Sequence, residues 1–206
     1  MSMTDVIAES HLRIVPANEV AAEDVQVVFA NGDAADRCQC QWFRSTPAEH
    51  RKTSRTQRID RLAAQAHFGD PEATTTAGLV AYLDDEPVAW CAVAPRSTYR
   101  RLLSSRIVWS GRHEDPDDES VWTVSCFVTR KGYRRRGVSY ALARAAIDFA
   151  RERGAKAVEG YPLITEPGRD VGWGELFVGS STVFTAAGFV EISRPTMRRA
   201  VMRIDL

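Results

Sequence analysis

The stretch from residue 121 to residue 139 reads VWTVSCFVTRKGYRRRGVS, and the rest of the chain is interpreted from it. Its first part is rich in β-branched, aromatic and apolar residues, which predicts a buried strand over 121–128. The residues at 140–153 then place apolar side chains at helical spacing, and Gly154 is typical of the C-cap of such a helix. The unit is therefore a strand, a basic turn that contains glycine, and a helix.

The turn has the chemistry of an anion site. A helix N-terminus presents unpaired backbone N–H groups and the positive end of the helix dipole. Arg134, Arg135 and Arg136 precede this helix, where a cluster of cations is unfavourable unless an anion binds. Gly137 allows close approach of the backbone to a ligand, and Ser139 offers a hydroxyl group. We therefore expect a phosphate or pyrophosphate at this turn.

The spacing Arg134-x-x-Gly137-x-Ser139 resembles the Arg/Gln-x-x-Gly-x-Gly/Ala motif of GNAT-type N-acetyltransferases. By itself so short a pattern leaves a solvated basic turn open as the alternative. Two later segments are similar to the same family and follow in its order, namely a second strand at 157–161 and the sequence FTAAGFVE at 184–191.

The resemblance covers about residues 11–204 and is strongest after Leu79. The turn at 129–133 is about one residue longer than is usual in the family, which leaves the individual backbone contacts open. The fold that the resemblance implies is a mixed α/β (α+β) GNAT fold. In that fold a mostly antiparallel sheet is splayed at its central strands, where the cofactor inserts, and helices flank the sheet.

The other elements are predicted from periodicity, capping residues and turn signals. They form one domain over 1–206, with residues 1–9 expected to be frayed. The predicted strands lie at 12–15, 78–83, 88–93, 155–161, 190–193 and 199–204. The predicted helices run from an N-cap at Asn18 to Phe29, from Thr53 or Ser54 to about Phe68, and from 179 to 187, with a helical turn at 95–103. Residues 34–50, 111–120 and 163–178 are expected to be irregular.

Composition limits the classes of function. The hydrophobic content is 44%, the charged content is 26% and the formal net charge is zero, which is ordinary for a globular protein and does not suit a polyanion-binding molecule. The sequence has neither a signal peptide nor an apolar run long enough to cross a membrane, so a cytoplasmic location is expected. Nucleic-acid binding through 131–136 is a weak alternative, because a recognisable reading motif is missing. We expect no nucleic-acid or membrane partner.

The resemblance also implies which residues bind the co-substrate, acetyl-CoA. The end of the strand is expected to hydrogen-bond the pantetheine arm, the turn to bind the pyrophosphate, and Phe184 to pack on the cofactor arm. The cofactor-binding residues expected on this basis are Phe127, Val128, Thr129, Arg134, Arg135, Arg136, Gly137, Val138, Ser139 and Phe184.

Acetyl transfer to an amine needs a neutral amine and a base, acting directly or through water. Glu159 lies on the strand that flanks the expected cleft and is the first candidate, although an exposed or salt-bridged strand carboxylate is an equally open interpretation. Tyr161, Ser125 and Glu119 rank lower. Phe184 stands where the family often has a tyrosine that protonates the leaving thiolate, and phenylalanine cannot donate a proton.

The four cysteines are expected to be reduced thiols. Cys38-x-Cys40 lacks the second ligand pair that a zinc site usually needs, so no metal is predicted. Trp42, which follows, suits an aromatic wall of the acceptor pocket. The long glycine-rich segment at 163–178 is expected to form part of the same pocket, with Trp173 or Phe177 as a wall.

These features together predict an acetyl-CoA-dependent N-acetyltransferase that acts on a small-molecule or peptide amine. The alternative is a non-catalytic module that binds acetyl-CoA and regulates another process. The sequence leaves open both the acceptor and the choice between a monomer and a homodimer.

Overall fold

A seven-stranded sheet, in the order β1-β2-β3-β4-β5-β7-β6, forms the centre of the fold. The computed structural model describes residues 6–30, 34–165, 171–172 and 174–206. Neighbouring strands are antiparallel, except that β4 and β5 run parallel. The strands are β1 (Leu12–Pro16), β2 (Gly78–Leu83), β3 (Glu86–Pro95), β4 (Val121–Thr129), β5 (Ala157–Gly160), β6 (Val190–Thr196) and β7 (Arg199–Asp205). This mixed, mostly antiparallel sheet confirms the predicted fold class.

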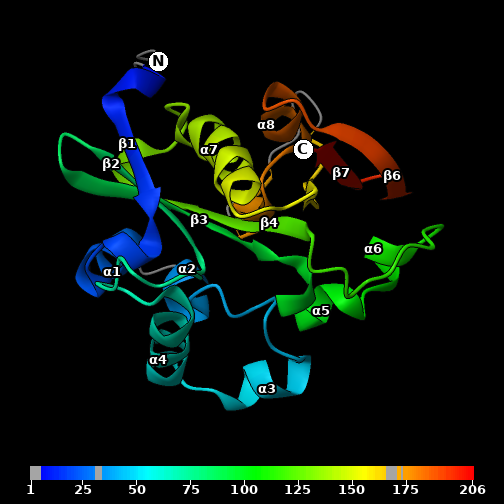
Figure 1. Cartoon of the computed structure of the whole chain (residues 1–206), viewed down its shortest axis with the longest axis horizontal. Helices are drawn as coiled ribbons and strands as arrows, with labels where there is room; N and C mark the ends of the chain where they lie inside the picture. Colours follow the sequence, from blue (N-terminus) through cyan, green and yellow to red (C-terminus); the bar gives the residue numbers. More distant parts are fainter. Residues whose placement is uncertain (1–5, 31–33, 166–170, 173) are drawn as a thin grey trace.

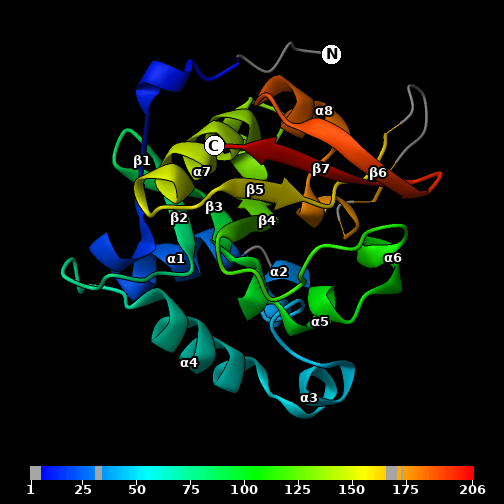
Figure 2. The same ribbon diagram turned by 45° about the vertical axis from the view of Figure 1, so that its right-hand side comes forward.

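Helices cover both faces of the sheet (Figure 1). The helices α7 and α8 pack on one face, and α1, α2 and α4 pack on the other (Figure 1). The short helix α6 lies next to β6, and α5 contacts α6 (Figure 2). The helices are α1 (Ala22–Phe29), α2 (Ala34–Cys38), α3 (Pro47–Lys52), α4 (Arg55–Ala66), α5 (Arg100–Leu103), α6 (Arg106–Trp109), α7 (Val138–Glu152) and α8 (Ser181–Ala186).

Strand β4 contributes side chains to the cores on both faces. Val124 and Phe127 belong to the core under α7, whereas Cys126 and Val128 belong to the core under α1 and α4. The register against β3 shifts at Ser125, because Val93 pairs with Val124 while Ala92 pairs with Cys126. The extra residue is a β-bulge, and it moves the alternation of side chains by one position.

The sheet opens between β4 and β5. Strand β4 pairs with β3 as far as Thr129, but within the described residues it pairs with β5 only over 121–124. Beyond this point β5 ends at Gly160, and the chain turns away through Pro162. The β5-facing edge of β4 over 125–129 therefore has no partner strand among the described residues.

Several predicted boundaries are corrected by tertiary contacts. Helix α1 begins at Ala22, because the Asn18 side chain donates to the carbonyl of Asp70 (3.1 Å) and so ties the chain to the turn after α4. Helix α4 has the predicted cap at Ser54, in a reciprocal capping box with Gln57. Helix α7 begins two residues earlier than predicted, at Val138.

The segment 34–50, predicted to be irregular, contains α2 and the start of α3. Helix α3 has a capping box between Thr46 and Glu49 and a proline at its first turn, a pattern that the prediction did not use. Helix α6 was also missed, because a single turn of four residues leaves no periodic pattern.

Candidate functional site

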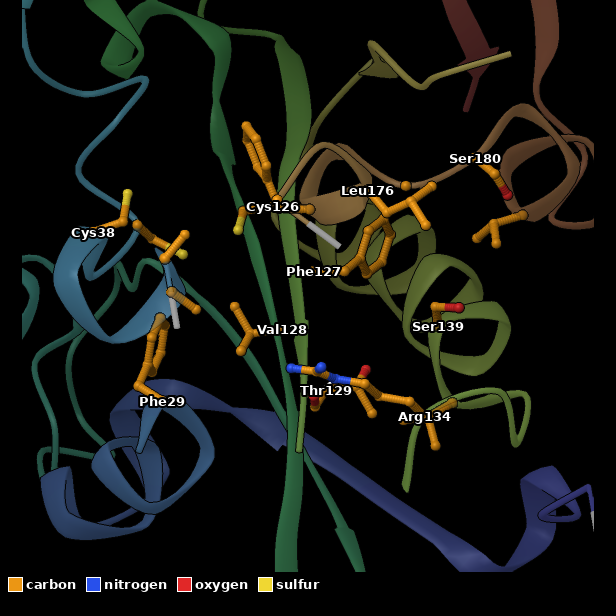
Figure 3. Close-up of a pocket in the computed structure, with 18 of the residues that line it drawn as sticks. Phe29, Cys38, Cys126, Phe127, Val128, Thr129, Arg134, Ser139, Leu176 and Ser180 are labelled. Carbon is orange, nitrogen blue, oxygen red and sulfur yellow. Dashed lines mark hydrogen bonds between the residues drawn. The ribbon is translucent and has the colours of Figure 1, made fainter. Parts of the chain in front are cut away.

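A cleft of about 960 Å³ runs along β4 at the point where the sheet opens. Phe127 and Thr129 line it from β4, Ser139 from the start of α7, and Ser180 from the start of α8. Across β4 it continues to Phe29 on α1 and Cys38 on α2 (Figure 3). The cleft therefore crosses the opening in the sheet and has one half on each side of β4 (Figure 3).

The turn before α7 holds a strained backbone. Gly137 is the N-cap of α7 and has a φ of 88°, a left-handed conformation that favours glycine. Arg135 is also left-handed, with a φ of 61°, which is uncommon for a residue with a side chain. No side chain among the described residues caps α7, so its first backbone N–H groups are left to a ligand or solvent. This geometry fits an anion at the helix N-terminus.

The three arginines of the turn have different positions. Arg134 and Arg135 line the cleft, and the Arg134 Nε donates to the carbonyl of Thr129 (2.9 Å). Arg136 is not among the residues found to line it, and its guanidinium lies 5.7 Å from the centre of the Tyr133 ring. The Arg136 carbonyl accepts a hydrogen bond from the N–H of Ile7 (3.0 Å). The structure thus brings Gly137, Val138 and Ser139 together with two of the three arginines.

Phe184 lies in the core. It is fully buried in α8, and its ring makes T-shaped contacts with Phe127 (5.9 Å) and Phe189 (5.0 Å). Phe127 lines the cleft and Phe184 is not among the lining residues, so this geometry favours support of the cleft wall over direct contact with a ligand. At the start of α8, Ser180 occupies the N-cap position, but its side chain makes no cap hydrogen bond. Its hydroxyl contacts Thr182 instead.

Glu159 is the centre of a buried charge cluster. Its carboxylate accepts hydrogen bonds from Arg96 (3.2 Å) and Arg203 (3.2 Å), and Arg112 donates to both of its oxygens. The hydroxyl of Tyr161 donates to it as well (2.8 Å). The side chains of Glu159 and Arg96 are fully buried. Arg96 and Arg112 flank the α5–α6 segment and both bind Glu159, so the cluster ties the two ends of this segment to β5. Arg96 also donates to the carbonyls of Asp115 and Pro116.

This environment does not favour the predicted role of Glu159 as the base. Burial alone would raise the pKa of Glu159, but the hydrogen bond from Arg112 and the charges of Arg112 and Arg96 outweigh it and lower that pKa. A carboxylate held in this way is a weak proton acceptor, and it is not among the residues that line the cleft. The salt-bridged interpretation of Glu159 accounts better for the geometry. Tyr161 is bound within the same cluster.

His50 and Trp42 form a wall that the sequence pattern did not predict as a unit. The two rings meet edge to face with centroids 5.2 Å apart, and both residues line the cleft. Burial, together with the charges of Arg58 and Arg101, lowers the pKa of His50 and so favours its neutral imidazole. His50 Nδ1 is buried and has no hydrogen-bond partner among the described residues. No spacing in the sequence relates His50 to another titratable residue of the cleft.

The four cysteines form no disulfide in the structure, and they lie close enough to interact with one another. Cys38, Cys40 and Cys126 line the cleft, and the thiol of Cys126 interacts with that of Cys40. Cys91 is fully buried nearby in β3. Burial and the neighbouring Cys40 raise the pKa of the Cys38 thiol to about 11. Among the described residues no group of histidine, cysteine, aspartate or glutamate has an arrangement that could hold a metal ion.

We expect Cys38 to react slowly with iodoacetamide at pH 7. A pKa of about 11 leaves roughly 100-fold fewer thiolates than an ordinary thiol has at this pH, and the thiolate is the reactive form. The measurement is the labelling rate followed by mass spectrometry, with glutathione as the control. Labelling at the glutathione rate would contradict the raised pKa.

The segment after β5 contributes to the cleft. Val171, Gly174, Leu176 and Phe177 line it, and the Phe177 ring lies 5.9 Å from that of Phe43. Phe177 is therefore placed as a wall, one of the two possibilities that the sequence raised. Trp173, the other, lies outside the described residues.

No helix in the described part of the chain is both long enough and apolar enough to cross a membrane.

Comparisons with known proteins agree with this geometry. The sequence matches the model of the acetyltransferase (GNAT) family over residues 38–161. The fold is similar to that of a GCN5-related N-acetyltransferase from Kribbella flavida, with 16% identity, a TM-score of 0.50, and 97% of this chain and 100% of that chain covered. It is also similar to an acetyltransferase of the GNAT family from Streptococcus pneumoniae, with 14% identity, a TM-score of 0.50, and coverage of 95% and 99%. Identities this low show a shared fold alone. No curated protein sequence matches the chain.

Proposed function

The chain belongs to the GNAT family of acetyltransferases, and from this premise we propose that it transfers the acetyl group of acetyl-CoA to an amine. The observation that carries the proposal is the open edge of β4 over 125–129, next to an α7 N-terminus without a side-chain cap. In this function residues 1–206 form one acetyltransferase domain, which acts as a monomer or a homodimer on a small-molecule or peptide amine.

The cleft fits an extended co-substrate. Backbone N–H and C=O groups along the open edge of Phe127, Val128 and Thr129 would pair with the amides of the pantetheine arm, as an added strand would. The N–H groups at the start of α7, with Arg134 and Arg135, would bind the pyrophosphate. Arg136 and Phe184 would act on acetyl-CoA only indirectly. Arg136 supports the turn through Tyr133, and Phe184 supports Phe127.

Acetyl-CoA supplies an activated thioester. In the transfer, the amine nitrogen forms a bond to the acetyl carbonyl carbon, the carbon–sulfur bond breaks, and the proton lost by the amine balances the one gained by the thiol. A cleft that binds the two reactants side by side would make the attack effectively intramolecular. Neutral His50 lines this cleft, whereas Glu159 is bound by arginines, so His50 or water is better placed than Glu159 to accept the proton.

Two observations support the alternative of a non-catalytic acetyl-CoA-binding module. The cleft lining includes no aspartate or glutamate among the described residues, and Phe184 replaces the tyrosine that often protonates the thiolate in the family. Product formation with any amine distinguishes the two functions. Binding of acetyl-CoA without acetylation of any acceptor would favour the module.

We expect acetyl-CoA to raise the melting temperature of the protein. A ligand present at 100 times its Kd stabilises the native state by about 2.7 kcal/mol, which corresponds to roughly 5–10 °C for a chain of this size. The measurement is thermal unfolding with and without 1 mM acetyl-CoA, with acetate plus inorganic phosphate as the control. The absence of a shift at millimolar acetyl-CoA would count against the proposed function.

A further inference from the structure

Three arginines line the cleft in addition to those of the turn before α7. Arg37 reaches it from α2, Arg58 from α4 and Arg199 from β7. They come from segments far apart in the sequence, so no motif predicted that they would meet the same cleft. They lie outside the turn to which the pyrophosphate is assigned.

None of the three arginines forms a salt bridge among the described residues, although the charge of Glu175, which is bound to Arg198, also acts on Arg199 through space. Arg58 donates to Thr53 Oγ1 (3.2 Å) and to the backbone carbonyls of Arg37 (2.6 Å) and His50. Arg199 donates to the carbonyl of Tyr161 (3.5 Å). Neutral oxygen acceptors of this kind orient a guanidinium group but carry no negative charge to compensate its positive charge.

The acidic side chains nearby are paired with other arginines. Asp36 accepts from Arg55 (2.6 Å), and Glu175 accepts from Arg198 (2.8 Å). The described lining of the cleft therefore contains arginines and no acidic side chain. Inside a partly enclosed cleft such a field attracts anions and repels cations.

The cleft that these arginines line is also apolar between its charges. Phe29, Trp42 and Phe177 line it, and the guanidinium of Arg101 lies 3.8 Å from the centre of the Trp42 ring. Aromatic walls with a few charged groups are typical of a site for a small molecule with an apolar body and an anionic end. A polyamine or a lysine in a basic peptide lacks the anion that this field favours.

We propose that the acceptor is an amine that also carries a carboxylate, on an apolar body such as that of an apolar amino acid, and that Arg37, Arg58 and Arg199 select for the carboxylate. This inference rests on the acetyl transfer proposed above. The transfer is then the formation of an amide at the amino group of the acceptor, with release of the coenzyme A thiol, and the carboxylate is unchanged.

The test compares acceptors that differ only in the carboxylate. Phenylalanine, leucine, methionine and tryptophan are each assayed with acetyl-CoA beside the corresponding amide, with spermidine as a cationic acceptor, and acetylated products are measured by mass spectrometry. We expect kcat/KM for the best carboxylate acceptor to exceed that of its amide by about 10-fold to 100-fold, the effect of one charge-assisted hydrogen bond.

Variants connect the preference to the cleft. Arg37→Gln and Arg199→Gln should each raise KM for the carboxylate acceptor by about 10-fold and leave KM for its amide and for acetyl-CoA almost unchanged. Arg51→Gln is the matched control, because it removes the same charge from an exposed arginine that is not among the lining residues. Arg58 is left in place, since its hydrogen bonds support the loop around His50.

Three outcomes would overturn the inference while the protein still binds acetyl-CoA. They are equal kcat/KM for an amino acid and its amide, a preference for spermidine, and the absence of acetylation of every carboxylate acceptor. The first two leave the proposed acetyl transfer intact. Failure to bind acetyl-CoA would instead remove the proposed function and this inference together.

Discussion

Replacement of Glu159 by glutamine is expected to destabilise the fold by about 3–5 kcal/mol, the effect of removing one partner from a buried ion pair. Glutamine keeps the shape of the side chain but removes the charge that compensates Arg96 and Arg112. Arg96 is fully buried, so solvent cannot replace the lost carboxylate. The measurement is the free energy of unfolding from urea titration.

Glu191→Gln is the matched control for this variant. Glu191 pairs with Arg194 on the surface (2.7 Å), where such a pair contributes little, so its loss should change stability much less. If Glu159 were the base instead, Glu159→Gln would keep normal stability and lose about 100-fold or more in kcat. A stable, inactive variant would therefore restore the prediction made from the sequence.

The same cluster gives stability a defined dependence on pH. The pKa of Glu159 is lower in the folded protein than in the unfolded chain, so the unfolded chain binds a proton first as the pH falls. The stabilisation by Glu159 is fully present above about pH 4.5 and is lost as the pH falls through the folded-state pKa. In the Glu159→Gln variant, the decrease in the free energy of unfolding that comes from protonation of Glu159 should be absent.

Replacement of Gly137 by valine is expected to weaken the binding of acetyl-CoA by at least about 10-fold. The sequence suggested that the added side chain would block the phosphate, but the structure gives another reason. A β-carbon at position 137 would lie 3.3 Å from Val6 Cγ1, and its φ of 88° is one that β-branched residues avoid. Relief of about 1–2 kcal/mol of strain would rotate the first N–H groups of α7 away from the anion.

Gly154→Val is the control for Gly137→Val. Gly154 lies just after the other end of α7, with a φ of 77°, and a β-carbon there would meet nothing within 4 Å. Both variants carry the strain of a left-handed residue, but only the one at 137 lies at the cleft. Isothermal titration with acetyl-CoA measures the difference. Equal affinities of the two variants would remove Gly137 from the proposed site.

The sequence by itself determined the strand, turn and helix around 121–153. Strand propensity, glycine at a left-handed position and helical periodicity act over a few neighbouring residues, so they can be read from the chain directly. The structure confirms β4 and α7 at that place, and the motif at Arg134 and Gly137 identified the family that the comparisons show. The boundaries moved where remote contacts intervened, as at Asn18.

Only the tertiary structure decided the environment of Glu159 and the charge of the cleft. The three arginines that bind Glu159 lie between 44 and 63 residues away in the sequence. The alternation of side chains along β5 did not indicate which arginines would lie close to Glu159. Likewise, Arg37 and Arg199 meet one cleft although they are far apart in the chain. The energy of a buried charge depends on partners brought in by distant segments, whereas secondary structure depends on neighbours along the chain.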